Sequence, residues 1–323
     1  MKRSTIFISL ILLFSFLVGS ISSLAQTKSP KILILGDSIS SGYGLEGYPN
    51  KDFLNYGKIF AKSLGSDSPD EYVNLSIDGE TTGGLLWRIE NSDAELFSGF
   101  DAVILSSGGN DLIDSLLPSV ISLISEISKE SYNDGDIFKK ISLISESFFA
   151  SAERTSEIVG RNLDLILSQI KENNSHAYTA VLSVYDPFDD KENNGAIKLI
   201  DQLLISPCID IINTNIKNSA EKNGFDYIDV ASIFKGNASH YTNIKSLDIH
   251  PNATGHLAIG EKITELYNKS ASTDVFLKTD NGYPAAENHV RRAFAIASIA
   301  GATLFGCAFV VISFGKFKVK LIQ

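Results

Sequence analysis

The sequence predicts an α/β fold in which helices cover both faces of a five-stranded parallel sheet. Five short apolar runs occur in order along the chain, and helical stretches separate them, which is the alternation typical of parallel sheets. The first run is apolar at nearly every position, as expected for a strand buried on both faces. The five runs are residues 31–35, 72–75, 102–106, 177–184 and 227–230.

Apolar residues three and four positions apart indicate the helices between these runs. Residues 53–64 and 83–97 are expected to form helices, and residues 194–216 form a later one that breaks near Pro207. Residues 112–173 are long for one connection. They hold three apolar helical runs, at residues 116–127, 137–149 and 158–170.

The last of these three runs is interpreted as the ordinary helix that leads into the fourth strand. The first two form an expected helical insertion at about residues 112–150, beside the end of the third strand. Such an insertion either overhangs a site at the sheet edge, as a lid or acyl-chain wall, or only adds bulk to the fold. The sequence leaves both interpretations open.

The first 25 residues have the layout of a secretory signal peptide. Lys2 and Arg3 precede an apolar stretch at residues 6–18, and a small residue, Ala25, ends a cleavage-site pattern. An uncleaved anchor is the alternative. The sequence therefore predicts that the body of the protein is exported.

The last part of the chain predicts a transmembrane helix. Residues 293–314 carry no charge over 22 positions, which is long enough to cross a bilayer, and basic residues flank them on both sides. A buried core helix is the alternative. We expect a single-pass protein of the cell membrane whose main domain is extracellular. The expected parts are a signal peptide (1–25), the main α/β domain (26–269), a polar, irregular stalk (270–290), and a membrane helix with a short basic tail (291–323).

The charge distribution argues against nucleic acid as a partner. The formal net charge is −10, but the two ends, 1–25 and 291–323, hold seven basic residues and no acidic ones. The remaining 265 residues carry 21 basic against 38 acidic side chains and therefore repel phosphate backbones. The two cysteines, Cys208 and Cys307, lie on opposite sides of the expected membrane boundary and should not pair.

A serine follows the first strand within the stretch KILILGDSISSGYGL, residues 31–45. Ser38 is then placed at the sheet edge where open α/β sheets bind their ligands. On this stretch alone, Ser38 is either a helix N-cap or a nucleophile. The stretch is not a G-x-S-x-G elbow, because Ser40 stands where the last glycine would be.

Three further stretches follow in order: NLSIDGETT at residues 74–82, SGGND at 107–111 and DIHPNATG at 248–255. Together with GDS, these stretches resemble the four blocks of the SGNH hydrolases, also called the GDSL lipase/esterase family. The resemblance extends from about residue 31 to about residue 267. It implies a flavodoxin-like three-layer α/β/α fold, with the strands in the order 2-1-3-4-5, and hydrolysis of esters.

The resemblance also assigns roles to individual residues. Ser38 matches the nucleophile and His250 the general base, a task for which the near-neutral pKa of histidine is suited. The oxyanion would be bound by the backbone N–H groups of Ser38 and Gly79 and by the side-chain amide of Asn110. Asp37 is expected to be a structural loop residue.

The catalytic acid departs from the family pattern. The family usually places it three positions before the histidine, where this chain has Leu247, whereas Asp248 stands two positions before. Either Asp248 completes a triad through a different turn, or a Ser38–His250 dyad operates with a carbonyl group orienting the ring. We favour Asp248 as the third member.

The sequence thus predicts a membrane-anchored serine esterase that acts on a small acyl ester, a lipid or an acylated glycan. The amino-acid sequences of the blocks are most similar to those of the lysophospholipase and thioesterase branch. An O-acetyl esterase or acyltransferase acting on carbohydrate or cell wall is the alternative. A non-catalytic surface module that binds glycan or lipid is the alternative of another class. No metal-ligand spacing or phosphate-binding loop is visible, so no cofactor and no metal are expected.

Overall fold

The computed structural model describes residues 29–49, 53–66, 68–127, 134–192, 195–246 and 248–280. The chain divides into two compact units, residues 1–266 and residues 267–323. The first unit holds the sheet and nearly all of the described helices. The described part of the second unit is residues 267–280.

The sheet has five parallel strands in the order β2-β1-β3-β4-β5, which confirms the predicted architecture and order. The apolar runs form strands because their side chains are buried on both faces of the sheet, as at every position of β1 and β3. The strands are β1 (Ile32–Gly36), β2 (Tyr72–Asn74), β3 (Ala102–Ser106), β4 (Tyr178–Leu182) and β5 (Asp226–Ile228).

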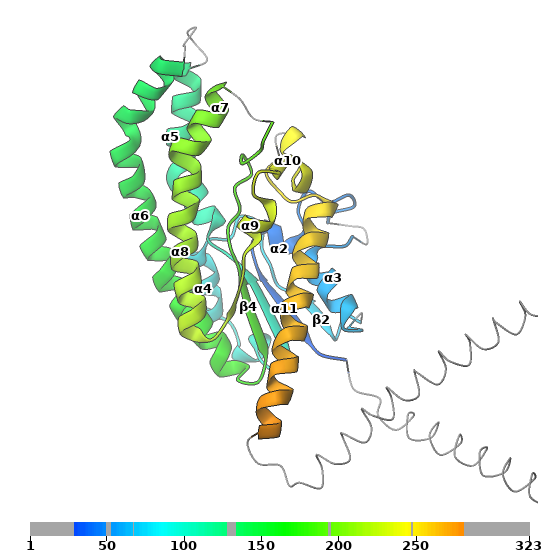
Figure 1. The fold of residues 1–323 in the computed structure, drawn as a ribbon. Helices are drawn as coiled ribbons and strands as arrows, with labels where there is room; N and C mark the ends of the chain where they lie inside the picture. The colour runs from blue at the N-terminus through cyan, green and yellow to red at the C-terminus, as the bar shows by residue number, and fades with distance from the viewer. Residues whose placement is uncertain are drawn as a thin grey trace, which may run out of the picture. The chain divides into compact units, whose positions relative to one another are not determined.

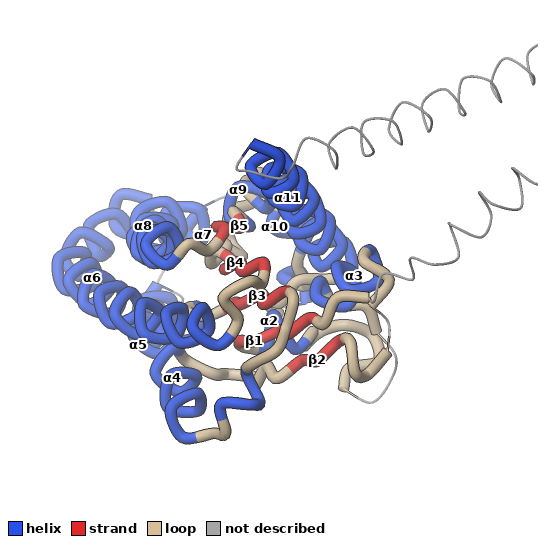
Figure 2. Tube along the Cα trace, turned by 90° about the horizontal axis from the view of Figure 1, so that it is seen from below, coloured by secondary structure: helices blue, strands red, loops and turns tan. Residues whose placement is uncertain are grey.

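Helices cover the sheet on both sides (Figure 1), and the view along the layers places α4, α5, α6 and α8 on one face and α3 and α11 on the other (Figure 2). The longer helices are α3 (Tyr56–Ser63), α4 (Thr82–Asn91), α5 (Gly109–Ile127), α6 (Asp134–Asn173), α8 (Ser206–Asn223) and α11 (Ala253–Asp280). The short ones are α2 (Ser38–Ser41), η1 (Ala94–Phe97), α7 (Gly195–Ile200), η2 (Asp201–Ile205), α9 (Val230–Phe234), α10 (Ala238–Tyr241) and η3 (Ile244–Ser246).

Alternate residues of the central strands supply the two halves of the core. Leu33 and Leu35 of β1 pack into the cluster that includes Val159 and Leu163 of α6. Ile34 points the other way, toward α3, where a Cβ added at Gly57 would lie 2.7 Å from it. Because both faces are apolar, the sheet is held rigidly, and its strand ends provide fixed positions for a site.

The helical insertion differs from the expectation in one respect. The second and third apolar runs do not form separate helices but join in the 40-residue helix α6. The polar stretch between them is not a break, because its small side chains pack: Ala152 is buried, and the Ser156 hydroxyl donates to the Ile211 carbonyl at 3.0 Å. Ser115 of α5 lies 2.9 Å from the hydroxyls of both Ser151 and Thr155, so α5 and α6 pair along this stretch.

The helix of residues 194–216 breaks near Pro207, as predicted: the π-helical turn η2 ends two residues before it, and Pro207 itself lies in the first turn of α8, where proline is tolerated. One further expectation is corrected. The expected irregular stalk is helical in its first part, since α11 continues to Asp280. No proline or glycine follows Gly260 to end this helix before that point.

The expected signal peptide, residues 1–25, and the expected transmembrane helix, residues 293–314, lie outside the described residues. Among the helices that the structure describes, none combines the length and the apolar composition needed to cross a bilayer. Cys208 is buried in α8 with its thiol free, and burial raises its pKa to about 12. It therefore behaves as a small apolar side chain.

Candidate active site

Ser38 lies just beyond the carboxyl end of β1, at the first position of α2. The chain turns at Gly36, whose φ of +128° suits only glycine and whose added Cβ would lie 1.9 Å from the Ser106 carbonyl oxygen. Asp37 then caps α2 by accepting the Ile39 N–H at 3.0 Å. This turn places the Ser38 side chain at the edge of the sheet, with a relative exposure of 9%.

His250 reaches Ser38 from a loop 212 residues further along the chain. Its Nε2 lies 2.9 Å from Ser38 Oγ, and its Nδ1 lies 2.5 Å from Asp248 Oδ1. The same Asp248 oxygen accepts the backbone N–H of His250 at 3.0 Å. The three side chains therefore form a continuous chain of hydrogen-bonding groups from carboxylate to imidazole to hydroxyl.

Hydrogen bonds from three directions fix the loop that carries His250. The Asn243 N–H donates to the His250 carbonyl at 2.9 Å, and the Tyr185 hydroxyl at the end of β4 donates to the Ile249 carbonyl at 2.7 Å. Asn252 donates to the Thr242 carbonyl at 3.0 Å and, with its oxygen, caps the start of α11. The imidazole is thereby positioned before any substrate arrives.

The charge on Asp248 is stabilised in place. Partial burial raises its pKa, but hydrogen bonds from the backbone and ring of His250 outweigh that effect and lower the pKa below its ordinary value. Asp248 is therefore ionised at neutral pH. An ionised carboxylate at Nδ1 favours the tautomer that leaves Nε2 free to accept a proton from Ser38.

The second and third blocks meet next to the segment that carries Ser38. Asn110 lies in the first turn of α5, where the helix dipole favours negative charge, and its Nδ2 donates to the Glu80 carbonyl at 3.1 Å. Gly79 precedes Glu80 and has φ +75°, with no atom within 4 Å of an added Cβ. This positive φ is a backbone conformation that favours glycine.

The loop that carries Gly79 is held at both ends. Before it, the two carboxylate oxygens of Asp78 accept the Ser41 hydroxyl at 2.5 Å and the Tyr48 hydroxyl at 2.6 Å. After it, Asp111 accepts both the N–H and the hydroxyl of Thr82, at 2.9 and 2.7 Å. Both ends thus connect this loop to the segments that carry Ser38 and Asn110.

Several supporting residues carry no sequence signal. Glu80 forms a bidentate ion pair with Arg88 of α4 at 2.9 and 2.7 Å, in a site where both side chains are largely buried. The Tyr43 ring packs against His250 with 4.6 Å between centroids. Tyr185 and Asn243 also stabilise the histidine loop. Their roles depend on tertiary position, and only the G-Y-G spacing after the serine draws attention to Tyr43.

Asp37, beside the serine, is structural, as its capping bond indicates. It is 2% exposed, and burial raises its pKa to about 7 in spite of hydrogen bonds from the Ile39 N–H and the Ser106 hydroxyl. His256, which is buried, accepts the Tyr56 N–H and takes no part in the Ser38 chain. Within the described ranges, no three His, Cys, Asp or Glu side chains come together as metal ligands.

This arrangement is suited to acyl transfer. A serine activated by a base, a base oriented by a carboxylate, and amide donors beside the serine are the groups that a tetrahedral oxyanion intermediate requires. Residues 34–258, more than half of the chain, match the sequence profile of the GDSL-like Lipase/Acylhydrolase family. The chain belongs to this family. As a GDSL-type hydrolase, the protein is an enzyme that cleaves ester bonds.

The chain is also similar to individual proteins. The uncharacterized protein YpmR of Bacillus subtilis (strain 168) is 23% identical over 256 residues, which cover 76% of this chain and 85% of YpmR. The lipase Lip_vut3 from a goat rumen metagenome is 20% identical over 72% of this chain and 95% of its own, with a TM-score of 0.50, and shares the fold. An extracellular lipase from Streptomyces rimosus is 19% identical over 71% of this chain and 97% of its own, with a TM-score of 0.49.

Proposed function

We propose that this GDSL hydrolase is an exported, membrane-anchored serine esterase that cleaves acyl esters through an acyl-enzyme intermediate. The observation that carries the catalytic part is the hydrogen-bonded chain from Asp248 through His250 to Ser38. The anchoring part rests on the sequence alone, on the charge-free residues 293–314 and the leader-like residues 1–25.

In the first half of the reaction, Ser38 Oγ attacks the ester carbonyl carbon while His250 Nε2 takes the hydroxyl proton. The carbonyl oxygen becomes an oxyanion that accepts hydrogen bonds from the N–H groups of Ser38 and Gly79 and from the Asn110 amide. Collapse of this intermediate breaks the bond to the alcohol. The leaving oxygen receives the proton from His250, and the acyl group remains on Ser38.

In the second half, water replaces the alcohol. His250 takes a proton from the water as its oxygen attacks the acyl carbon, and the same donors bind the second oxyanion. Collapse releases the carboxylic acid and returns the proton to Ser38. Asp248 remains ionised throughout and stabilises the imidazolium that forms in each half.

Hydrolysis of p-nitrophenyl acetate and p-nitrophenyl octanoate by the full-length protein tests the catalytic proposal. We expect turnover of at least one ester and its loss in the Ser38→Ala variant. Equal rates for the parent and Ser38→Ala would overturn the proposal. Inactivity of both toward these and acetylated-sugar esters would overturn it as well.

Alkaline carbonate washing of membranes from expressing cells tests the anchoring proposal. A protein held by a spanning helix remains in the pellet, because the wash removes only peripheral proteins. Protease added to intact cells should then digest the domain that contains Ser38. Release into the supernatant, or protection from the protease, would contradict anchoring or export respectively.

A further inference from the structure

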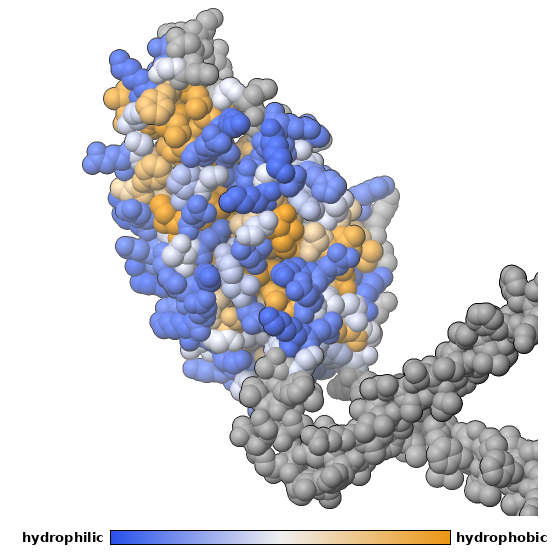
Figure 3. All heavy atoms as spheres, viewed as in Figure 1, coloured by the Kyte–Doolittle hydropathy of each residue, from blue (hydrophilic) through white to orange (hydrophobic). Residues whose placement is uncertain are grey.

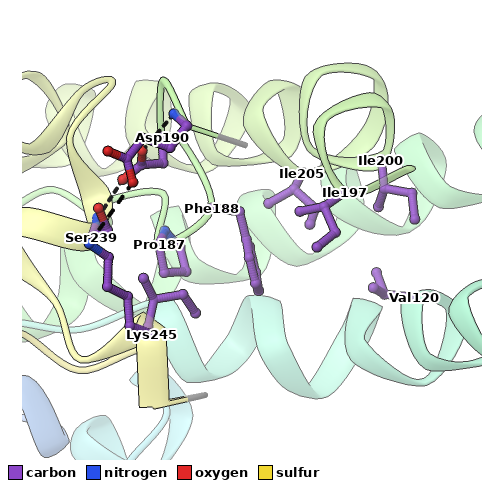
Figure 4. A pocket seen from close by; sticks show the side chains of 11 residues that line it. Val120, Pro187, Phe188, Asp190, Ile197, Ile200, Ile205, Ser239 and Lys245 are labelled. Carbon is purple, nitrogen blue, oxygen red and sulfur yellow. Dashed lines mark hydrogen bonds and ion pairs between the residues drawn. The ribbon is translucent and has the colours of Figure 1, made fainter. Parts of the chain in front are cut away.

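An apolar groove of about 390 Å³ lies between the insertion helix α5, the loop after β4, the α7–η2 segment and the turn η3 (Figure 4). This volume lies within the range of roughly 300–1,000 Å³ that is typical of small-molecule sites. Its apolar lining comes mainly from Val120, Pro187, Phe188, Ile197, Ile200 and Ile205.

One end of the groove adjoins the loop that carries His250. Ile244 and Lys245 of η3 line the groove, and the preceding residue, Asn243, is hydrogen-bonded to the His250 backbone. On the other side, Pro187 lies two residues after Tyr185, whose hydroxyl holds the Ile249 carbonyl. The groove and the catalytic loop are thus built on the same two segments.

The groove is polar at one end and apolar at the other. Asp190, Ser239 and Lys245 gather at one end, whereas Ile197, Ile200 and Val120 lie at the other (Figure 4). The polar end includes η3, on the side of the catalytic loop. This polarity matches a ligand that has a polar group toward the catalytic loop and a hydrocarbon chain that extends away from it.

The polar groups at that end are already bonded within the protein. The Asp190 carboxylate accepts the N–H groups of Glu192 and Ser239 at 2.9 and 2.7 Å. Lys245 lies 4.0 Å from the Glu192 carboxylate. A sugar in this groove would bury hydroxyls opposite apolar side chains without partners, which is costly, whereas an alkyl chain has no hydrogen bonds to lose.

Exposed apolar side chains also occur on the helices of this part of the molecule. Ile197 is 55% exposed, and Ile121, Phe138 and Leu143 on the α5–α6 hairpin are exposed as well. Figure 3 shows apolar side chains gathered at this end of the molecule.

We infer that this groove binds the acyl chain of the substrate, so that the enzyme prefers esters of medium- and long-chain fatty acids to acetyl esters. The inference deepens the proposed function and rests on it for the reaction, although the groove itself can be tested without catalysis. It also assigns the insertion a role, because Val120 of α5 forms one wall. The insertion is then an acyl-chain wall and not only added bulk.

A chain-length series of p-nitrophenyl esters, from acetate to palmitate, tests the inference with the full-length protein. Each buried methylene should raise kcat/KM by about two- to fourfold until the groove is filled. The Ile197→Glu variant places a charge at the apolar end, at an exposed position that tolerates substitution. It should lower kcat/KM for octanoate and longer esters about tenfold relative to kcat/KM for acetate.

Leu165→Glu is the matched control, since Leu165 on α6 is 51% exposed and does not line the groove. It should leave the whole series unchanged. Val120→Phe fills the groove from the α5 side and should shift the preferred chain length downward. Acetate hydrolysis by each variant reports that the protein is folded and active. The inference would be overturned if kcat/KM did not vary with acyl-chain length. It would also be overturned if Ile197→Glu and Leu165→Glu changed kcat/KM for long esters equally.

Calorimetric binding of decanoate to the Ser38→Ala variant separates failure of the groove from failure of the esterase. If decanoate binds and the Ile197→Glu substitution weakens this binding at least fivefold, the acyl site is supported. If no ester is turned over in that case, only the proposed function fails. Ester turnover without decanoate binding, and without a chain-length preference, overturns the acyl site alone.

Discussion

Asp248 contacts His250 twice with a single carboxylate oxygen, which accepts the backbone N–H at 3.0 Å and lies 2.5 Å from ring Nδ1. The backbone contact spans two residues and folds the loop into a tight turn. This turn is how a carboxylate two positions before the histidine, instead of three, reaches the imidazole. The alternative dyad, in which a carbonyl orients the ring, is not the arrangement observed.

The Asp248→Asn variant should lower kcat by roughly 10²–10⁴ with little change in KM. An amide cannot stabilise the imidazolium, and its N–H₂ group favours the wrong ring tautomer, which in comparable triads has large effects on kcat. Steady-state kinetics on a p-nitrophenyl ester measure this effect. Glu46→Gln, which removes an exposed carboxylate near the site, is the control and should change kcat less than twofold. An Asp248→Asn variant with nearly full activity would exclude Asp248 from the catalytic machinery.

The Asn110→Ala variant should lower kcat by about 10²–10³, the loss typical of removing one oxyanion donor. KM should change little, because the hydrogen bond strengthens only as negative charge develops on the oxygen. Asn91→Ala on α4, whose amide donates to the Trp87 carbonyl, provides the comparison. Equal kcat values for the two variants would show that Asn110 does not stabilise the oxyanion.

Gly79 and Gly99 form a matched pair for testing the second backbone donor. Their φ values are +75° and +76°, and an added Cβ meets no atom within 4 Å at either position. Alanine at each should therefore cost about 1–2 kcal/mol of stability through backbone strain alone. Thermal unfolding should show similar losses for the two variants, whereas only Gly79→Ala should reduce kcat. Equal activity of both variants at a temperature where they are folded would contradict a role for the Gly79 N–H.

The raised pKa of Asp37 makes stability depend on pH in a predictable direction. The folded-state pKa of about 7 lies above the unfolded value of roughly 3.9, so the folded state holds the proton between these values. Stability from this group is therefore complete below about pH 4 and is lost as the pH rises toward 7, by about 1.4 kcal/mol per pH unit. Asp37→Asn keeps the capping oxygen without titrating.

The Asp37→Asn variant should gain stability relative to the parent as the pH rises from 5 to 7, and it should keep ester hydrolysis within a few-fold. Thermal unfolding at several pH values measures this difference. A stability difference that does not vary with pH would show that Asp37 is ionised in the fold throughout that range.

The strands and the serine–histidine pair follow from local signals in the sequence. Residues 102–106 are buried on both faces as their apolar run predicts, and Ser38 and His250 stand in short blocks whose neighbours restrict their conformation. The continuity of α6 was not predictable, because its polar middle is held by contacts to α5 and α8 that are distant in sequence. The groove beside Pro187 could not be predicted from the sequence either, since its walls come from four segments that only the tertiary fold brings together.

Covalent labelling with a fluorophosphonate, followed by fragmentation of the tryptic peptide Ile32–Lys51, tests the central claim most directly. This peptide contains Ser38, Ser40 and Ser41, so the two neighbours act as internal controls. Ser40 is buried against Tyr56, and the Ser41 hydroxyl donates to Asp78, so neither is placed to react. The account predicts an adduct on Ser38 alone that is lost in the His250→Ala variant. An adduct on another serine, or labelling of Ser38 that does not depend on His250, would contradict it.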